Sequence, residues 1–256
     1  MKPLITVIIM LSLAAQSAQA RSQATQIPTL PAQSHPALTI THLTGDLYVY
    51  TTWHVIDDGP YPSNSMYLVT PKGAVMFDTP WDSTQFQPLL DSIYARHRQR
   101  VVLCISTHFH KDRTAGLAFL QQQGIATWSS AMTLELCRQR HENQAAHTFT
   151  KDTTFNIGDY SFRTFYPGPG HTKDNIVIWL PEDKVLYGGC FVKSTEAPTI
   201  GFVGDGDLTA YPSSIMRLIK EFPHPTYIIP GHLGWTDNRS LEYTLKLVQQ
   251  YKDTHP

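Results

Sequence analysis

Two histidines and an aspartate occupy alternate positions in one short segment. Residues 106–113 read S-T-H-F-H-K-D-R and follow a continuous apolar run. In extended backbone, side chains two positions apart point the same way, so His108 and His110 can approach one metal ion, with Asp112 one step further along. Imidazole and carboxylate suit zinc. A His-x-His pair alone recurs by chance, and three polar residues at a strand end are the alternative, which Asp112 weakens.

Three more candidate ligands each directly follow a glycine. His171 ends P-G-P-G-H, Cys190 ends Y-G-G-C, and His232 ends I-P-G-H. The first stretch favours a sharp turn, and the other two lie just past expected strands. Glycine before the ligand allows the backbone to approach closely. Core packing explains three such placements poorly, so the six residues together indicate a metal site.

The ordered set of six resembles the metallo-β-lactamases. The resemblance extends over nearly the whole chain beyond the N-terminal segment. It includes D-T-P-W at 78–81, the block 106–116, G-H-T-K-D-N at 170–175, G-G-C-F-V-K-S at 188–194 and P-G-H at 230–232.

Departures from related groups narrow the resemblance to the first subclass. Many relatives on the same fold carry a histidine directly after the aspartate, where this chain has Arg113, and they lack a cysteine ligand, whereas Cys190 is present here. The single-zinc second subclass has asparagine at the position of His108.

The resemblance implies an α/β protein with the four-layer αβ/βα sandwich of the metallo-β-lactamase fold. It also implies two zinc ions as cofactors, one held by three histidines and one by an aspartate, a cysteine and a histidine. These sets are His108, His110 and His171, and Asp112, Cys190 and His232.

The implied activity is hydrolysis of β-lactam antibiotics (penicillins, cephalosporins and carbapenems), which confers resistance. A metal-bound hydroxide would attack the β-lactam carbonyl, because zinc brings the pKa of water to near neutral. Asp112 would be catalytic as well as a ligand, by orienting this nucleophile. The motifs of the serine routes, S-x-x-K, K-T-G and G-x-S-x-G, are absent from the sequence.

Further roles follow from matched positions. Lys193 corresponds to the cation that holds the substrate carboxylate, although a surface lysine is the alternative. Phe202 replaces an asparagine that often helps to bind the carbonyl oxygen, so a side-chain donor is lacking there. Arg113 and Asp78 are expected beneath the metals, with a structural role as the alternative for Asp78. Lys111 is expected to be a solvated lysine.

Strands and helices alternate loosely along the chain, which predicts the mixed α/β class. Strands are expected at 47–52, 66–70, 74–78, 101–106, 125–128, 154–157, 160–166, 176–180, 185–188 and 227–229, and helices at 82–97, 114–123, 131–140, 211–221 and 240–251. Residues 53–65 contain Gly59, Pro60 and Pro62 and indicate a long turn or loop. Within it, Trp53, Val55 and Ile56 could cover the substrate or simply pack.

The N-terminus predicts export. A short basic start, an apolar stretch at 4–13 and A-Q-A at 18–20 are typical of a signal peptide, residues 1–20, cleaved after Ala20. Residues 21–36 indicate a loose arm, and residues 37–256 a single domain. The predicted location is the periplasm, where Cys104 and Cys137 could pair or remain core thiols.

The 256 residues carry a formal net charge of −1 and are 41% hydrophobic. This balance argues against disorder and against nucleic acid as a partner, and no membrane anchor is expected. Monomer is the default expectation. Two other functions stay open: hydrolysis of another ester, thioester or lactone, and zinc binding without turnover.

Overall fold

Two β-sheets organise the computed structural model, which describes residues 37–56 and 59–255. The first sheet has seven strands in sequential order, β1 to β7. Their bounds are Leu38–Thr44, Leu47–Ile56, Gly59–Thr70, Gly73–Phe77, Val101–Ile105, Ala126–Ser130 and His147–Phe149. The second sheet has five strands in the order β12-β11-β10-β9-β8. In chain order from β8, these span Thr154–Ile157, Tyr160–Phe165, Val177–Leu180, Val185–Gly189 and Tyr227–Pro230.

Strand direction changes within each sheet. In the first sheet β1 to β4 pair antiparallel, whereas β4 to β7 pair parallel through helical connections. In the second sheet only β11 and β12 are parallel. β11 and β12 are parallel neighbours and end at the same edge of the second sheet, so the loops that follow them can contribute to one site.

Six α-helices and one 3₁₀ turn are present in the described part of the chain. The helices α1 to α6 span Phe86–His97, Lys111–Thr114, Leu117–Gln122, Ala131–Arg140, Tyr211–Glu221 and Ser240–Thr254. Asp82 caps the 3₁₀ turn Ser83–Gln85 that leads into α1, since its side chain accepts from the Thr84 amide at 2.9 Å. Ser130 caps α4 in the same way through the Thr133 amide.

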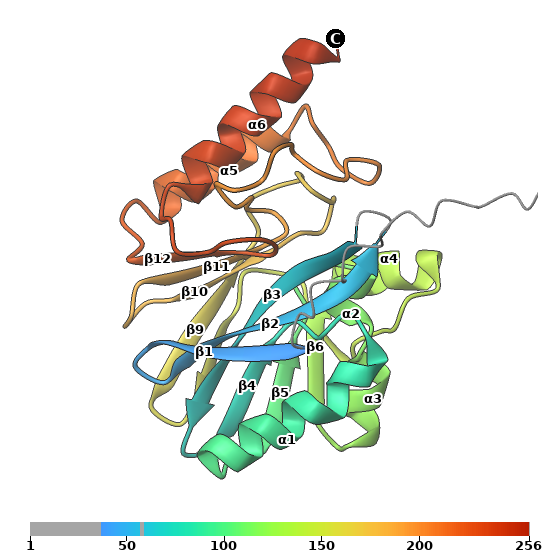
Figure 1. Ribbon diagram of the computed structural model, residues 1–256, viewed down its shortest axis with the longest axis vertical. Coiled ribbons are helices and arrows are strands. Elements are labelled where there is room, and N and C mark those ends of the chain that lie inside the picture. The colour runs from blue at the N-terminus through green and yellow to red at the C-terminus, as the bar shows by residue number, and fades with distance from the viewer. Residues whose placement is uncertain (1–36, 57–58, 256) are drawn as a thin grey trace, which may run out of the picture. The chain divides into compact units, whose positions relative to one another are not determined.

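Three separate apolar cores define four layers. The central core joins the two sheets and includes Phe77 of β4 and Ile178 of β10. A second core packs β10 to β12 against α5 and α6, and a third packs the first sheet against α1 and α3. Alternate residues of one strand serve different cores: Phe77 faces the second sheet and Met76 faces the helices. The expected αβ/βα sandwich is confirmed (Figure 1).

The segment 53–65 was expected to be a loop, and this is wrong. In its described residues, β2 extends to Ile56 and β3 begins at Gly59, and the two strands pair as a hairpin with Val55 opposite Pro60 and Trp53 opposite Pro62. Pairing of β3 with β4 begins only at Met66. Pro60 and Pro62 therefore lie in a part of β3 that does not pair with β4, where the amide hydrogen that proline lacks is not needed for a hydrogen bond to that strand.

The helix expected at 114–123 is also different. Residues 111–122 form two short helices, α2 and α3, separated at Gly116. A Cβ at Gly116 would lie 3.0 Å from Thr79 Cβ, so the chain packs closely there. Strands β1 and β7 were not among the expected elements, and β7 is only three residues long.

All three cysteines are free and buried, so Cys104 and Cys137 are core thiols. No helix within residues 37–56 and 59–255 is long and apolar enough to cross a bilayer. The predicted signal peptide and N-terminal arm fall outside the described residues, and the single domain at 37–256 remains a prediction.

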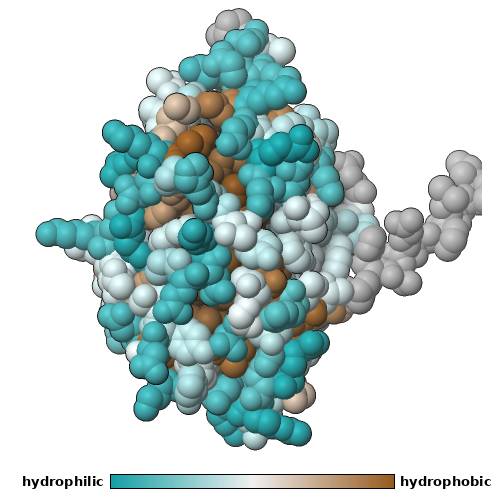
Figure 2. Space-filling model, turned by 90° about the vertical axis from the view of Figure 1, so that its left-hand side faces the viewer, coloured by the Kyte–Doolittle hydropathy of each residue, from teal (hydrophilic) through white to brown (hydrophobic). Residues whose placement is uncertain are grey.

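Large apolar side chains are scattered over the exposed surface. On the face shown in Figure 2, brown apolar groups are interrupted by hydrophilic side chains. The exposed large apolar residues of the described chain are Val55, Tyr94, Val102, Met132, Phe202 and Met216.

Candidate metal centre

The ends of several strands bring the candidate ligands together. β5 leads to His108 and His110, β11 ends directly before Cys190, and β12 ends two residues before His232. A Cβ at Gly231 would lie 2.7 Å from the Cys190 amide nitrogen. Glycine is therefore required where the chain before His232 passes the chain before Cys190, as the sequence had indicated.

Asp112 is placed by a helix and not by extended backbone. His110 has extended dihedral angles at the N-terminus of α2, and Asp112 lies in the first turn of that helix. The alternation argument is therefore wrong for Asp112. His108 and His110 do lie together, in a run of bends at residues 107–110 that follows the end of β5. The helical turn still brings Asp112 to the site, where its Oδ2 lies 3.1 Å from Cys190 Sγ.

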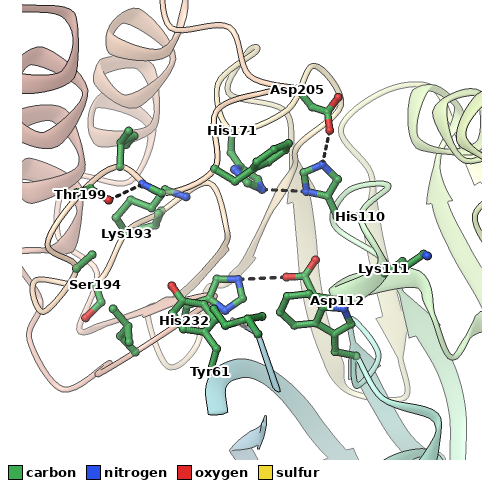
Figure 3. Close-up of a pocket in the computed structure, with 18 of the residues that line it drawn as sticks. Tyr61, His110, Lys111, Asp112, His171, Lys193, Ser194, Thr199, Asp205 and His232 are labelled. Atoms are coloured by element: carbon green, nitrogen blue, oxygen red, sulfur yellow. Dashed lines mark hydrogen bonds and ion pairs between the residues drawn. The ribbon is translucent and has the colours of Figure 1, made fainter. Parts of the chain in front are cut away.

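Three imidazoles form the first cluster. The ring centroids of His108, His110 and His171 lie 4.9 to 5.0 Å apart. Nδ1 of His110 lies 3.2 Å from Nε2 of His171 (Figure 3). Nε2 of His108 is buried and has no hydrogen-bond partner among the described residues. Burial lowers the pKa of His108 and of His171, which favours the neutral form that can bind a metal.

A carboxylate, a thiol and an imidazole form the second cluster. Asp112 Oδ2 lies 3.1 Å from Cys190 Sγ and 3.2 Å from His232 Nε2. Cys190 Sγ lies 3.2 Å from the same His232 nitrogen. Nδ1 of His232 lies 2.8 Å from the Pro62 carbonyl oxygen and donates to it, so a neutral ring directs its free lone pair at the other two groups.

These donors fit zinc. Overlapping triples have ligand atoms that all lie within 4.8 Å of one another: His108, His171 and Cys190; His108, His110 and Asp112; and Asp112, Cys190 and His232. Imidazole nitrogen, thiolate sulfur and carboxylate oxygen are the usual zinc ligands. The orphaned nitrogen of His108 would gain the partner that it lacks.

Arg113 contacts the second cluster and is fully buried. Its Nε donates to Asp112 Oδ2 and its Nη2 donates to Cys190 Sγ, both at 3.0 Å. Asp78 is buried nearby, and burial raises the pKa of its carboxyl to about 6, although Arg113 opposes this shift.

Asp205 and Arg140 belong to the site but were not predicted. His110 Nε2 donates to Asp205 Oδ2 at 3.0 Å, which leaves Nδ1 of His110 free to bind a metal. Arg140, from the last turn of α4, donates to the other oxygen of Asp205 at 2.5 Å. Asp205 comes from the loop before α5. Nothing in the spacing of these residues signals that they meet.

An open pocket of about 570 Å³ lies over both clusters. Lys193 lines it, and the Lys193 amide donates to Thr244 Oγ1 of α6 at 2.8 Å. Burial lowers the pKa of Lys193. Phe202 is 62% exposed on the rim, with its ring 5.8 Å from that of His110. Lys111 is exposed, as expected, and points away from the imidazoles (Figure 3).

The hairpin of β2 and β3 borders the same pocket. Ile56 and Tyr61 line it, whereas Val55 is 75% exposed. Gln85 donates to the Trp53 carbonyl oxygen at 2.8 Å, which ties the hairpin to the start of α1. Trp53, Val55 and Ile56 were considered as a cover over the substrate, and of these Ile56 lines the pocket.

Comparisons with known proteins agree with this geometry. Residues 58–232 match the family described as the metallo-beta-lactamase superfamily. The chain is 38% identical to metallo-beta-lactamase type 2 of Elizabethkingia meningoseptica over 220 residues, which are 86% of this chain and 88% of that protein. It is also 38% identical to metallo-beta-lactamase IND-1 of Chryseobacterium indologenes over 205 residues, 80% of this chain and 86% of the relative.

Solved structures show the same relationship. The crystal structure of metallo-beta-lactamase IND-7 has a TM-score of 0.81 and 36% identity, and the match covers 84% of this chain and all of that one. A metallo-beta-lactamase from Pontibacter korlensis has a TM-score of 0.80 and 34% identity, with 83% and 99% covered.

Proposed function

The chain belongs to the metallo-beta-lactamase superfamily, and from this premise we propose that it is a secreted di-zinc β-lactamase of the first subclass. Membership makes the chain an enzyme, a zinc-dependent hydrolase. The observation that carries the proposal is the contact of Asp112, Cys190 and His232 beside three clustered imidazoles. The substrates would be penicillins, cephalosporins and carbapenems, and their hydrolysis would confer resistance.

Two zinc ions would divide the six ligands. His108, His110 and His171, whose rings cluster, would hold one, and Asp112, Cys190 and His232 would hold the other. Bound zinc would supply a water molecule of lowered pKa as the nucleophile and would polarise the β-lactam carbonyl.

The side chains of the protein would prepare and orient the reactants. Asp112 would direct the attacking water with the carboxylate oxygen that is not held by Arg113 and His232. Lys193 would hold the substrate carboxylate, which lies beside the reactive ring, as a point charge. Phe202 offers no hydrogen bond to the carbonyl oxygen, so the polarisation of that oxygen would depend on the three-histidine side of the site.

The remaining expectations complete the proposal. The sequence pattern of residues 1–20 supports export to the periplasm with cleavage after Ala20. The scattered exposed apolar side chains of the described surface support a monomer. The net charge of −1 supports small-molecule substrates in place of nucleic acid.

A chromogenic cephalosporin tests the function directly. The zinc-loaded protein is expected to open its β-lactam ring, and a His108→Ala variant is expected to lose most of this activity. Penicillin and carbapenem assays then give the substrate range. Hydrolysis of thioesters or lactones without any β-lactam hydrolysis would identify a related hydrolase. Full zinc occupancy with no turnover of any of these substrates would identify a binding protein.

A further inference from the structure

Tyr187 lies in β11, three residues before Cys190, and its side chain is completely buried. Its hydroxyl oxygen lies 2.6 Å from Asp78 Oδ2 and 3.0 Å from Arg113 Nη1. A guanidinium group can only donate hydrogen bonds, so Tyr187 accepts from Arg113. The phenol has one proton to donate. It donates this proton to Asp78, because the carboxylate is charged and lies nearer than the Asn64 carbonyl oxygen, which is 3.2 Å away.

Asp78 connects this hydroxyl to the three-histidine side of the site. Its Oδ1 accepts from the Thr107 amide at 2.6 Å, and its Oδ2 accepts from Thr107 Oγ1 at 2.8 Å. Thr107 directly precedes His108, and its hydroxyl lies 3.3 Å from His108 Nδ1. The position of the Asp78 carboxylate therefore helps to fix the backbone and the ring of His108.

Arg113 connects the same hydroxyl to the other side. It contacts Asp112 and Cys190 at 3.0 Å each, and its Nη2 donates to the Gly231 carbonyl, next to His232, at 2.9 Å. Asp78 Oδ2 and Arg113 Nη1 are 3.6 Å apart, which is too long for a direct hydrogen bond. The phenol of Tyr187 therefore completes the connection between them.

We propose that Tyr187 is a positioning residue that sets the spacing between the two zinc-ligand sets. It acts through Asp78 and Thr107 on His108, and through Arg113 on Asp112 and Cys190. The inference rests on the proposed function, because it concerns how these side chains are held for two zinc ions. Groups behind metal ligands alter metal affinity when they are removed, by roughly 10- to 100-fold.

The Tyr187→Phe variant tests the role of the hydroxyl. The ring and its packing remain, while Asp78 loses one donor and Arg113 loses one acceptor. Zinc affinity is measured by competition with a chromophoric chelator. We expect two zinc ions per chain in the wild type and a roughly 10- to 100-fold weaker second ion in the variant. In cobalt-substituted protein, the absorption band of the Cys190–cobalt bond should shift or weaken.

Tyr67→Phe is the matched control. Tyr67 is also buried, but its hydroxyl pairs with His97 at 2.9 Å, and neither residue lines the pocket or belongs to the two clusters. This variant loses a buried phenol hydroxyl as well, so it should change stability without changing zinc affinity or the cobalt spectrum.

A double mutant separates positioning from general damage. If Tyr187 acts through Asp78, the losses of zinc affinity in Tyr187→Phe and Asp78→Asn should combine to less than their sum in free energy. Additive losses would overturn the proposal, as would wild-type affinities and spectrum in Tyr187→Phe. Both outcomes would leave the proposed function intact if the wild type binds two zinc ions. A wild-type protein that binds no zinc would overturn the proposed function and this inference together.

Discussion

Arg113 donates a hydrogen bond to the sulfur of Cys190 at 3.0 Å, and both side chains are buried. Burial raises the pKa of the Cys190 thiol, and Arg113 acts in the opposite direction. A buried thiolate at this point would therefore face a fixed positive charge as well as a metal ion. The contact explains how a soft anionic ligand can be accommodated between Asp112 and His232.

Replacement of Cys190 by serine is expected to weaken the second zinc selectively. Thiolate binds zinc strongly and a neutral hydroxyl does not, while serine keeps nearly the same size. Zinc content and cephalosporin turnover should fall together, and the circular dichroism spectrum should stay unchanged. Nearly two zinc ions per chain with unchanged turnover would contradict the role of Cys190.

Lys193→Ala is expected to raise KM for β-lactams by roughly 10- to 100-fold. A hydrogen bond to a charged group contributes about 1.5–3 kcal/mol, and 1.4 kcal/mol corresponds to tenfold in affinity. If the contact is equally strong in the ground and transition states, kcat is unaffected. Steady-state kinetics at full zinc occupancy measures both constants.

Three further variants isolate the effect of charge at Lys193. Lys193→Glu should be worse than alanine because it adds repulsion, and Lys193→Arg should retain much of the binding. Lys111→Ala removes the same charge from an exposed lysine on the pocket rim and should change KM less. An unchanged KM in both Lys193→Ala and Lys193→Glu would show that the carboxylate is held elsewhere.

Asp205→Asn is expected to weaken zinc binding by the three histidines. The carboxylate accepts from His110 Nε2 and thereby fixes the ring and its tautomer, and such partners affect metal affinity by roughly 10- to 100-fold. Arg140→Met should have a smaller effect, because its side chain is more than half exposed and water screens the pair. Competition with a chelator gives both affinities. A larger loss in Arg140→Met than in Asp205→Asn would contradict the assignment.

His97 is expected to make stability depend on pH. Burial, with help from Arg96, lowers its pKa below 6.5, the ordinary value that applies in the unfolded chain. The unfolded state therefore binds more protons, so this contribution is present above about pH 6.5 and is lost as pH falls through the lower folded value. Nε2 of His97 also lies 2.9 Å from the Tyr67 hydroxyl oxygen.

The comparison of wild type with His97→Gln measures this effect. Urea unfolding at about pH 8 and about pH 5 should show a stability advantage of the wild type that shrinks in acid. Both proteins keep the same metal centre, so its own acid sensitivity cancels in the difference. An advantage that is constant or grows in acid would show that His97 is not held in its neutral form.

The alternation of strands and helices predicted the α/β class, local motifs indicated the ligand candidates, and the four layers were implied by the resemblance to the metallo-β-lactamases. The helices expected at 131–140 and 211–221 have the bounds of α4 and α5, and the glycine before His232 signalled a close approach of two segments of the chain. The hairpin at 53–65 was missed because its prolines favour a turn. Proline fits a strand where no second strand pairs with it, and the sequence does not show that β4 begins to pair with β3 only at Met66.

Tyr187 and Asp205 could not be predicted for another reason. Tyr187 resembles any apolar strand residue, and Asp205 resembles any polar loop residue, until the two sheets are packed together. Their partners lie 109 positions away for Tyr187 with Asp78 and 95 for Asp205 with His110. Contacts of this kind follow from tertiary structure and not from a pattern along the chain.

Zinc content and cephalosporin hydrolysis, measured on the same samples during removal and return of the metal, test the central claim most directly. After exhaustive chelation, elemental analysis should find no zinc and hydrolysis should be absent, because the chain has no serine route to the same reaction. Activity should return in step with added zinc, and clavulanate should have little effect. Full hydrolysis by protein shown to be free of zinc would contradict the account.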